Sequence, residues 1–163
     1  MKGKKNWRLS KTLSRSIIVR PIEDVDVKYV WAAYKKDGLA QFPFPKDLDA
    51  PTFKSAFEHF VLSSAHAAWS IMANGRVIGL AMGQFVGPLM IITAINWFPW
   101  ASRRNIVEGT VHLFNSIRKQ FPVIGMANDE HRPLYEACCM HGIMKRVGTS
   151  HSMGKMTVFE CRN

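Results

Sequence analysis

The spacing of apolar residues predicts one strand and two amphipathic helices in the first 64 residues. SIIVRP, residues 16–21, is rich in β-branched side chains and ends at proline, as a short strand does. In residues 23–38 apolar side chains recur at spacings of three, four and seven, acids come first and glycine comes last, which predicts a helix. Residues 52–64 repeat phenylalanine at helical spacing and predict a second helix.

Three strands are predicted next. AAWSIMA, residues 67–73, and RVIGLAMGQFV, residues 76–86, flank Asn74-Gly75, a pair that favours a tight hairpin because both residues tolerate positive φ. After a Gly-Pro pair, residues 89–98 are almost continuously apolar. Because such runs are typical of strands buried on both faces, we expect residues 89–98 at the centre of a sheet and covered on both sides.

The stretch SRRNIVEGTVHLF, residues 102–114, predicts a loop that opens into an amphipathic helix. Val107, Val111, Phe114 and Ile117 fall on one face of that helix. The remaining pattern predicts a short strand, a helix with proline in its first turn and glycine at its end, and two closing strands. These elements are expected at residues 123–127, 133–142, 143–150 and 155–162.

The predicted order is strand, helix, helix, three strands, helix, strand, helix and two strands. This alternation predicts an α/β protein. A chain of 163 residues fits one domain. We expect a basic flexible arm at residues 1–15 and a single domain at residues 16–163.

Charge and cysteine content narrow the classes of function. The net charge is +10, and residues 1–15 hold six basic residues and no acid. Such an arm can bind nucleic acid or an acidic partner, or can be a solvated end. No apolar run approaches the length of a membrane span, and the N-terminus lacks the apolar core of a secretory signal, so we expect no membrane partner and a cytoplasmic protein. Three cysteines without metal-ligand spacing predict reduced thiols and no metal.

The element order and residues 102–114 resemble the GCN5-related N-acetyltransferase superfamily, the acyl-CoA N-acyltransferase fold. In that family a loop of pattern Q/R-x-x-G-x-G/A follows a central strand, and its amides hold the coenzyme A pyrophosphate at a helix N-terminus. Arg104 matches the first position, Val107 stands at the first glycine and Gly109 at the second. The resemblance implies a splayed, mixed central sheet and a cofactor site formed by Arg103, Arg104, Asn105, Val107, Gly109 and Thr110.

A second family landmark is an asparagine followed by a helical tyrosine, whose hydroxyl protonates the departing thiolate. Two alignments compete. Counting forward from Asn128 places Tyr135 at the tyrosine position, whereas counting back from Gly142 places Cys138 there and His131 at the asparagine. The resemblance therefore implies Tyr135 or Cys138 as the catalytic acid and Asn128 or His131 as a cofactor contact.

The strand end INWFPW is a further site implied by the resemblance, which assigns main-chain contacts with the pantetheine arm to Phe98 and Trp100. No carboxylate lies between Trp69 and Arg103 to act as a base. The histidines with suitable intrinsic pKa values are His66, His112, His131 and His151, and spacing singles out none of them.

The function implied by the resemblance is transfer of an acetyl group from acetyl-CoA to a primary amine by direct attack. The acceptor amine is unidentified, and a homodimer is left open. The alternative is a catalytically degenerate protein similar to GNAT-like proteins of tailed bacteriophages. It would be virion-associated or would bind nucleic acid through its arm, and its location would be the host cytoplasm or the virion.

Overall fold

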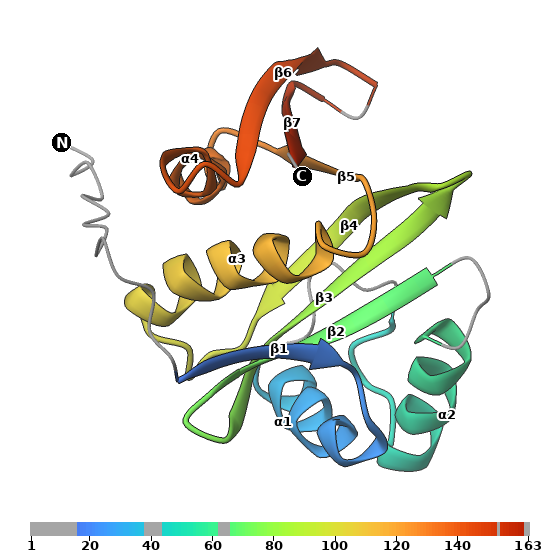
Figure 1. Cartoon of the computed structure of the whole chain (residues 1–163). Coiled ribbons are helices and arrows are strands. Elements are labelled where there is room, and N and C mark those ends of the chain that lie inside the picture. The colour runs from blue at the N-terminus through green and yellow to red at the C-terminus, as the bar shows by residue number, and fades with distance from the viewer. Residues whose placement is uncertain (1–15, 38–43, 62–65, 153, 162–163) are drawn as a thin grey trace, which may run out of the picture.

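A computed structural model describes residues 16–37, 44–61, 66–152 and 154–161 (Figure 1). Within these residues the chain forms one seven-stranded sheet with helices on both faces. The elements in chain order are β1 (Ile17–Pro21), η1 (Asp24–Asp26), α1 (Val27–Asp37), α2 (Ala50–Val61), β2 (His66–Ala73), β3 (Arg76–Val86), β4 (Leu89–Trp97), α3 (Arg103–Ile117), β5 (Val123–Ala127), α4 (Arg132–Met140), β6 (Met144–Ser150) and β7 (Met156–Cys161). The predicted order is confirmed.

The strands lie in the order β1-β2-β3-β4-β5-β7-β6. Five neighbouring pairs are antiparallel, and the β4–β5 pair is parallel. A parallel pair needs a crossover connection, which α3 provides between β4 and β5. The predicted mixed sheet is therefore confirmed, and β4 is its central strand.

Two apolar cores cover the two faces of the sheet. Helices α1 and α2 pack against one face through a cluster that includes Phe53, Phe57 and Leu80. Helices α3 and α4 lie on the other face (Figure 1), over a cluster that includes Ile71 and Phe114. Strands β2, β3 and β4 contribute side chains to both cores because successive residues of a strand point to opposite faces.

Strand β4 is less covered than predicted. Met90 and Ile92 are buried, but Thr93 is exposed and the residues on either side of it differ in burial. The reason is the parallel partner: β5 accompanies β4 along only part of its length. One side of the second half of β4 is therefore open.

A buried polar group joins β1, η1 and β2. Asp26 is 1% exposed, and both of its carboxylate oxygens accept hydrogen bonds from Arg20, at 2.7 and 2.8 Å. The Ser70 hydroxyl donates to Asp26 Oδ2 at 2.7 Å, and the Glu23 amide donates to the same oxygen at 2.9 Å. Every oxygen of the buried carboxylate thus has a partner, which fixes the start of α1 against the sheet.

Among the described residues, no helix combines the length and the apolar content that a membrane span requires. The basic arm predicted at residues 1–15 lies outside the described residues. Binding of nucleic acid or of an acidic partner through that arm stays a prediction.

Candidate active site between strands β4 and β5

The parallel strands β4 and β5 pair over three residues and then separate. The pairs are Met90 with Val123, Ile91 with Ile124, and Ile92 with Gly125. A bulge helps to separate the strands. On the β3 side Ile92 pairs with Gly83 and Ala94 with Met82, so that Thr93 has no opposite residue. Bulges bend a strand and increase its twist, which turns β4 away from β5.

A pocket lies in the opening. It is bounded by β4, by the end of β5, and by residues of α3, α4 and β7, so that both halves of the sheet contribute to it. Its lining consists of Ile92, Thr93, Ala94, Ile95, Trp97, Thr110, Met126, Ala127, Asn128, His131, Leu134, Tyr135 and Met156. The splay expected of the central sheet is thus present.

Backbone groups of β4 border this pocket. The Phe98 amide donates to the Ile78 carbonyl at 2.8 Å, so Phe98 directs its backbone groups toward β3. Backbone direction alternates along a strand, so the amide and carbonyl of Trp97 face the edge that β5 has left. Those groups are suited to an extended amide chain such as a pantetheine arm.

The main-chain contact predicted for Phe98 is not supported by this geometry, whereas the one predicted for Trp100 stays a prediction. The Phe98 amide and carbonyl are engaged by Ile78 and Ala101. The ring of Phe98 is buried in the core beneath α1 and α2. The Trp100 indole donates to the Val77 carbonyl at 2.8 Å, and the Arg76 guanidinium lies over the same ring at 4.3 Å from its centroid. Both aromatic side chains anchor the connection between β4 and α3.

Helix α3 begins earlier than predicted. Ser102 is its N-cap, and the Ser102 hydroxyl accepts a hydrogen bond from the Asn105 amide at 3.1 Å. The Ile106 amide donates to the Ser102 carbonyl at 2.9 Å. Arg103 and Arg104 lie exposed in the first turn, where the helix dipole is positive. An anion can bind there through two guanidinium groups and the first amides of the helix.

The predicted phosphate loop is helical, which corrects the role given to Val107 and Gly109. Both residues lie in the second turn of α3 and are buried. Inside a helix each amide donates to the carbonyl four residues earlier, so neither amide is available to a phosphate. The apolar face that includes Val111 and Phe114 continues through Val107, and its burial extends the helix toward its N-terminus.

Thr110 lies within α3 and also lines the pocket. Its hydroxyl donates to the Ile106 carbonyl at 2.7 Å, so it also lies within the helix rather than in a phosphate loop. The residue nevertheless lines the pocket from the α3 side. It can contact a bound molecule through its side chain, which is a different role from the backbone contact predicted.

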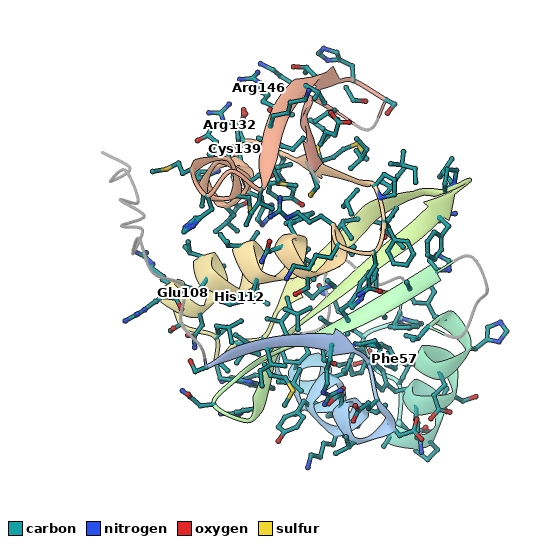
Figure 2. The ribbon with its side chains drawn as sticks, in the orientation of Figure 1. Phe57, Glu108, His112, Arg132, Cys139 and Arg146 are labelled. Atoms are coloured by element: carbon teal, nitrogen blue, oxygen red, sulfur yellow. The ribbon has the colours of Figure 1, made fainter. Side chains whose placement is uncertain are left out.

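Glu108 is buried on α3 beside an exposed partner. Its carboxylate is 2.8 Å from Arg104 Nε, and its side chain is 8% exposed whereas that of Arg104 is 72% exposed. Figure 2 shows Glu108 and His112 next to each other along α3. Arg104, the residue that matches the family motif, is thus shared between this carboxylate and any anion at the helix start.

Tyr135 is held rigidly in the wall of the pocket. Its ring lies between Phe114 and Phe159, with centroid distances of 5.2 and 5.3 Å. The bare α-carbon of Gly125 makes room for it, since a Cβ there would lie 2.5 Å from Tyr135 Cε1. Burial raises the pKa of the Tyr135 hydroxyl well above its ordinary value, and the neighbouring thiols of Cys138 and Cys161 raise it further. The hydroxyl therefore stays protonated at neutral pH and can act as a proton donor.

Asn128 and His131 lie together at the same pocket. Asn128 Oδ1 accepts a hydrogen bond from the His131 amide at 2.9 Å and lies 2.9 Å from His131 Nδ1. Asn128 follows β5 directly, and His131 is the N-cap of α4. The structure thus brings together three of the predicted site residues: Asn128, His131 and Tyr135.

Cys138 is outside the pocket. Its side chain is completely buried, and its Sγ donates to the Leu134 carbonyl at 3.6 Å. Burial raises the pKa of its thiol well above the ordinary value. Of the two residues that competed for the tyrosine position, only Tyr135 lines the pocket. This geometry favours the alignment that starts from Asn128.

Two of the histidines considered as bases, His66 and His151, lie outside the pocket lining. His66 packs against Phe60 at the start of β2, and His151 is exposed after β6. Arg132 and Cys139 on α4 and Arg146 on β6 gather at the outer side of the C-terminal half (Figure 2). Among the described residues, no group of three or more His, Cys, Asp or Glu side chains could hold a metal ion.

Sequence reasoning missed part of the lining. Thr93, Trp97, Met126 and Met156 border the pocket but were not predicted as site residues. The position of the bulge decides which residues of β4 face the opening, and no residue type in the stretch 89–98 indicates it. The only signal in the sequence that points to Trp97 as a site residue is its place beside Phe98 and Trp100.

The structure resembles solved N-acetyltransferases. One is the spermidine N-acetyltransferase from Vibrio cholerae in complex with CoA and spermine, with a TM-score of 0.62 and 10% identity over 90% of this chain and 95% of that chain. Another is AAC(6')-Ib in complex with paromomycin and acetyl-CoA, with a TM-score of 0.64 and 11% identity over 91% of this chain and 93% of that chain.

A third is the ribosomal-protein-S18-alanine N-acetyltransferase from Escherichia coli, with a TM-score of 0.54 and 15% identity over 89% of this chain and 92% of that chain. No protein-family model matches the sequence, and no curated protein matches it either. The similarity lies in the arrangement of the backbone. The chain has the acyl-CoA N-acyltransferase fold, and the resemblance inferred from the element order is confirmed at the level of fold.

Proposed function

We propose that the protein is an N-acetyltransferase that transfers an acetyl group from acetyl-CoA to a primary amine. The observation that carries the proposal is the pocket at the splay of β4 and β5, with the part of β4 beyond its three residue pairs with β5 on one wall and the Tyr135 side chain on another. Of the solved proteins with the same fold, the spermidine N-acetyltransferase holds CoA and spermine, and AAC(6')-Ib holds acetyl-CoA and paromomycin.

The residues of the pocket fit a pantetheine arm. The backbone groups of Trp97 would pair with its amides as a neighbouring strand would. Asn128 and Thr110 would supply polar contacts on the opposite walls, and Met126 and Leu134 would supply apolar ones. When bound, acetyl-CoA supplies a thioester whose carbonyl carbon accepts the amine.

The anion site of this protein would depend on side chains more than on backbone. Ser102 occupies the Asn105 amide, and the amides of Val107 and Gly109 lie within the helix. A pyrophosphate would therefore be held mainly by Arg103 and Arg104, assisted by the positive end of α3. Such a site is more sensitive to salt than a backbone cradle, since it relies on exposed charges.

The catalytic contribution of the chain would have two parts. The walls of the pocket hold the two reactants next to each other, which converts a bimolecular encounter into a local one. The Tyr135 hydroxyl would donate a proton to the leaving sulfur. General-acid catalysis of this kind raises a rate by roughly 10²- to 10⁴-fold. Like any phenol at neutral pH, the Tyr135 side chain carries the proton that the sulfur takes.

Calorimetry with acetyl-CoA tests binding, and release of free thiol in the presence of primary amines tests transfer. The amine panel contains a polyamine, an aminoglycoside and a peptide with a free N-terminus, the classes named for the structurally similar proteins. We expect binding of acetyl-CoA and amine-dependent thiol release. Folded protein that binds no acetyl-CoA at millimolar concentration would contradict the proposal.

A further inference from the structure

The reaction proposed above needs a proton acceptor as well as a donor. A primary aliphatic amine is mostly protonated at neutral pH, and only its neutral form has the lone pair that attacks a carbonyl. After attack the nitrogen must also lose a proton. A group with a free lone pair must therefore reach the nitrogen inside the pocket.

The described lining contains two side chains that exchange protons, His131 and Tyr135. Tyr135 is protonated at neutral pH, as a phenol is, so it has a proton to donate and is not suited to accept one. The internal segments outside the described residues, 38–43, 62–65 and 153, contain no Asp, Glu or His in their sequence. His131 is thus the imidazole in position to accept a proton, and imidazole is the side chain best suited to do so near neutral pH.

The hydrogen bonds to Asn128 determine which nitrogen of His131 accepts that proton. The His131 backbone amide donates to Asn128 Oδ1 at 2.9 Å, and an amide N–H requires an acceptor, so the atom is the oxygen of the Asn128 side chain. The same oxygen lies 2.9 Å from His131 Nδ1. Because this oxygen only accepts, Nδ1 carries the hydrogen and Nε2, on the other edge of the ring, keeps its lone pair.

We propose that His131 Nε2 is the proton acceptor of the acetyl transfer and that Asn128 positions it by holding the Nδ1–H tautomer. His131 is the catalytic residue in this pair, and Asn128 acts through it. The proposal rests on the acetyltransferase function proposed above. It assigns His131 a role different from the cofactor contact that the family resemblance implied.

The protons of the step balance, with one proton released to solvent for each amine that enters as ammonium. An amine that enters as ammonium first gives one proton to Nε2, which passes it to solvent. The neutral nitrogen then attacks the thioester carbon, a C–N bond forms, and the C–S bond breaks with its electron pair leaving on sulfur. The proton lost from nitrogen goes to His131 Nε2, and the sulfur takes the proton of the Tyr135 hydroxyl. The imidazolium then returns its proton to the phenolate.

The placement of the two residues supports this division of roles. His131 and Tyr135 are four residues apart at the start of α4, a spacing that brings side chains to the same face of a helix. One is half-exposed at the pocket and the other is buried in its wall. When two proton-exchanging side chains of one site differ in their environment, one can serve as the base and the other as the acid.

The test compares His131→Gln, Asn128→Leu and Asn128→Asp with His141→Gln as the matched control. His141 is also half-exposed on α4, at the opposite end of the helix and outside the pocket lining. We expect His131→Gln to lower kcat for the best amine of the panel by about 10²-fold or more, with acetyl-CoA affinity changed less than about 3-fold. Imidazole added to His131→Ala should restore part of the amine-dependent rate.

The positioning role of Asn128 is tested by two variants, one that removes the acceptor oxygen and one that keeps it. Asn128→Leu should lower kcat toward the value of His131→Gln, whereas Asn128→Asp should retain most of the rate because a carboxylate oxygen still accepts from Nδ1. Long-range ¹H–¹⁵N correlation spectra of the full chain should show neutral His131 as the Nδ1–H tautomer in the wild type and in Asn128→Asp. In Asn128→Leu the tautomer population should shift toward Nε2–H.

The outcomes separate this proposal from the proposed function. A wild-type protein that transfers acetyl groups while His131→Gln keeps its kcat would overturn the role of His131 and leave the acetyltransferase function standing. A wild-type His131 found as the Nε2–H tautomer would overturn the positioning role of Asn128. A wild type that transfers acetyl to no amine, although it is folded, would overturn the proposed function and with it the need for a base.

Discussion

The indole of Trp97 lies against the bare α-carbon of Gly109. A Cβ built on Gly109 would lie 2.7 Å from Trp97 Cη2 and 3.1 Å from Ile71 Cγ2. Gly109 is therefore the point at which α3 approaches the last residue of β4 and the strand β2. The glycine that matches the family motif contacts a tryptophan, and its role here is close packing.

We expect Gly109→Ala to lower the free energy of unfolding by about 1–2 kcal/mol, because the added methyl group overpacks the contact with Trp97. Helix propensity alone predicts the opposite sign, a gain of about 1 kcal/mol. Gly148→Ala is the control, since a Cβ at Gly148 meets nothing within 4 Å. Urea unfolding measures both, and a stabilised Gly109→Ala would contradict the packing role.

Val107→Gly should destabilise the protein without improving cofactor binding. Val107 is 6% exposed, so its loss removes buried apolar surface, and glycine weakens the helix; together we expect about 2–4 kcal/mol. Val107→Ala separates the cavity from the backbone effect. Acetyl-CoA affinity measured by calorimetry should stay the same or fall. An increase would mean that residues 103–109 leave the helix when the ligand binds.

Arg103 and Arg104 should differ when each is changed to alanine. Arg103→Ala should weaken acetyl-CoA binding by several-fold, and the loss of affinity should be larger at low salt. The free energy of unfolding should not change because Arg103 is exposed. Arg104→Ala should weaken binding and also cost about 1 kcal/mol, since it leaves the buried Glu108 without its 2.8 Å partner. Adding Glu108→Gln should recover that stability. Lys119→Ala, beyond the other end of α3, should change neither property.

Tyr135→Phe tests the choice between the two alignments. We expect kcat to fall by about 10²-fold while acetyl-CoA affinity changes little, because the ring still packs between Phe114 and Phe159. Cys138→Ala should keep kcat and lose about 1–2 kcal/mol of stability, since its thiol is fully buried in the core. The reverse pattern, with kcat lost only in Cys138→Ala, would contradict the placement of the acid.

The buried Asp26 should make stability depend on pH. Burial raises its pKa, but hydrogen bonds from Arg20, the Glu23 amide and Ser70 outweigh burial, and its pKa is lower than usual. Because the pKa of Asp26 is lower in the folded than in the unfolded chain, its ionised carboxylate stabilises the folded protein at pH values above about 4, the ordinary pKa of aspartate. This stabilisation is lost as the pH falls from there through the folded pKa. Asp26→Asn should cost about 3 kcal/mol at pH 7. The difference from wild type, measured by urea unfolding, should shrink at pH 3; a constant difference would contradict this origin.

The elements of this chain were predictable because each carries a local periodic signal. The strand at 123–127 matches the observed β5 in its bounds, and the hairpin at Asn74-Gly75 has positive φ at both residues. The helix starts were less predictable. α3 begins at Arg103, after the N-cap Ser102, because burial of Val107 extends the helix, a consequence of packing that the motif-based alignment did not contain.

The site was predicted in part. Asn128, His131 and Tyr135 were implied by the family resemblance, through two competing alignments, and all three line the pocket. The main-chain role given to Phe98 is not supported because alternation along β4 turns its amide toward Ile78. Which residue of a strand faces an opening depends on a bulge and on the partner strand, and neither leaves a mark in a run of apolar residues.

The sequence by itself determined the order of elements, their amphipathic faces and, through that order, the fold, since helical and strand periodicities depend on residues close in the chain. Only the tertiary structure decided where β5 leaves β4, that Gly109 packs against Trp97, and that the amide oxygen of Asn128 meets His131 Nδ1. These relationships join different elements or depend on the exact turn of a loop. They follow from how the elements pack, which residue spacing alone does not specify.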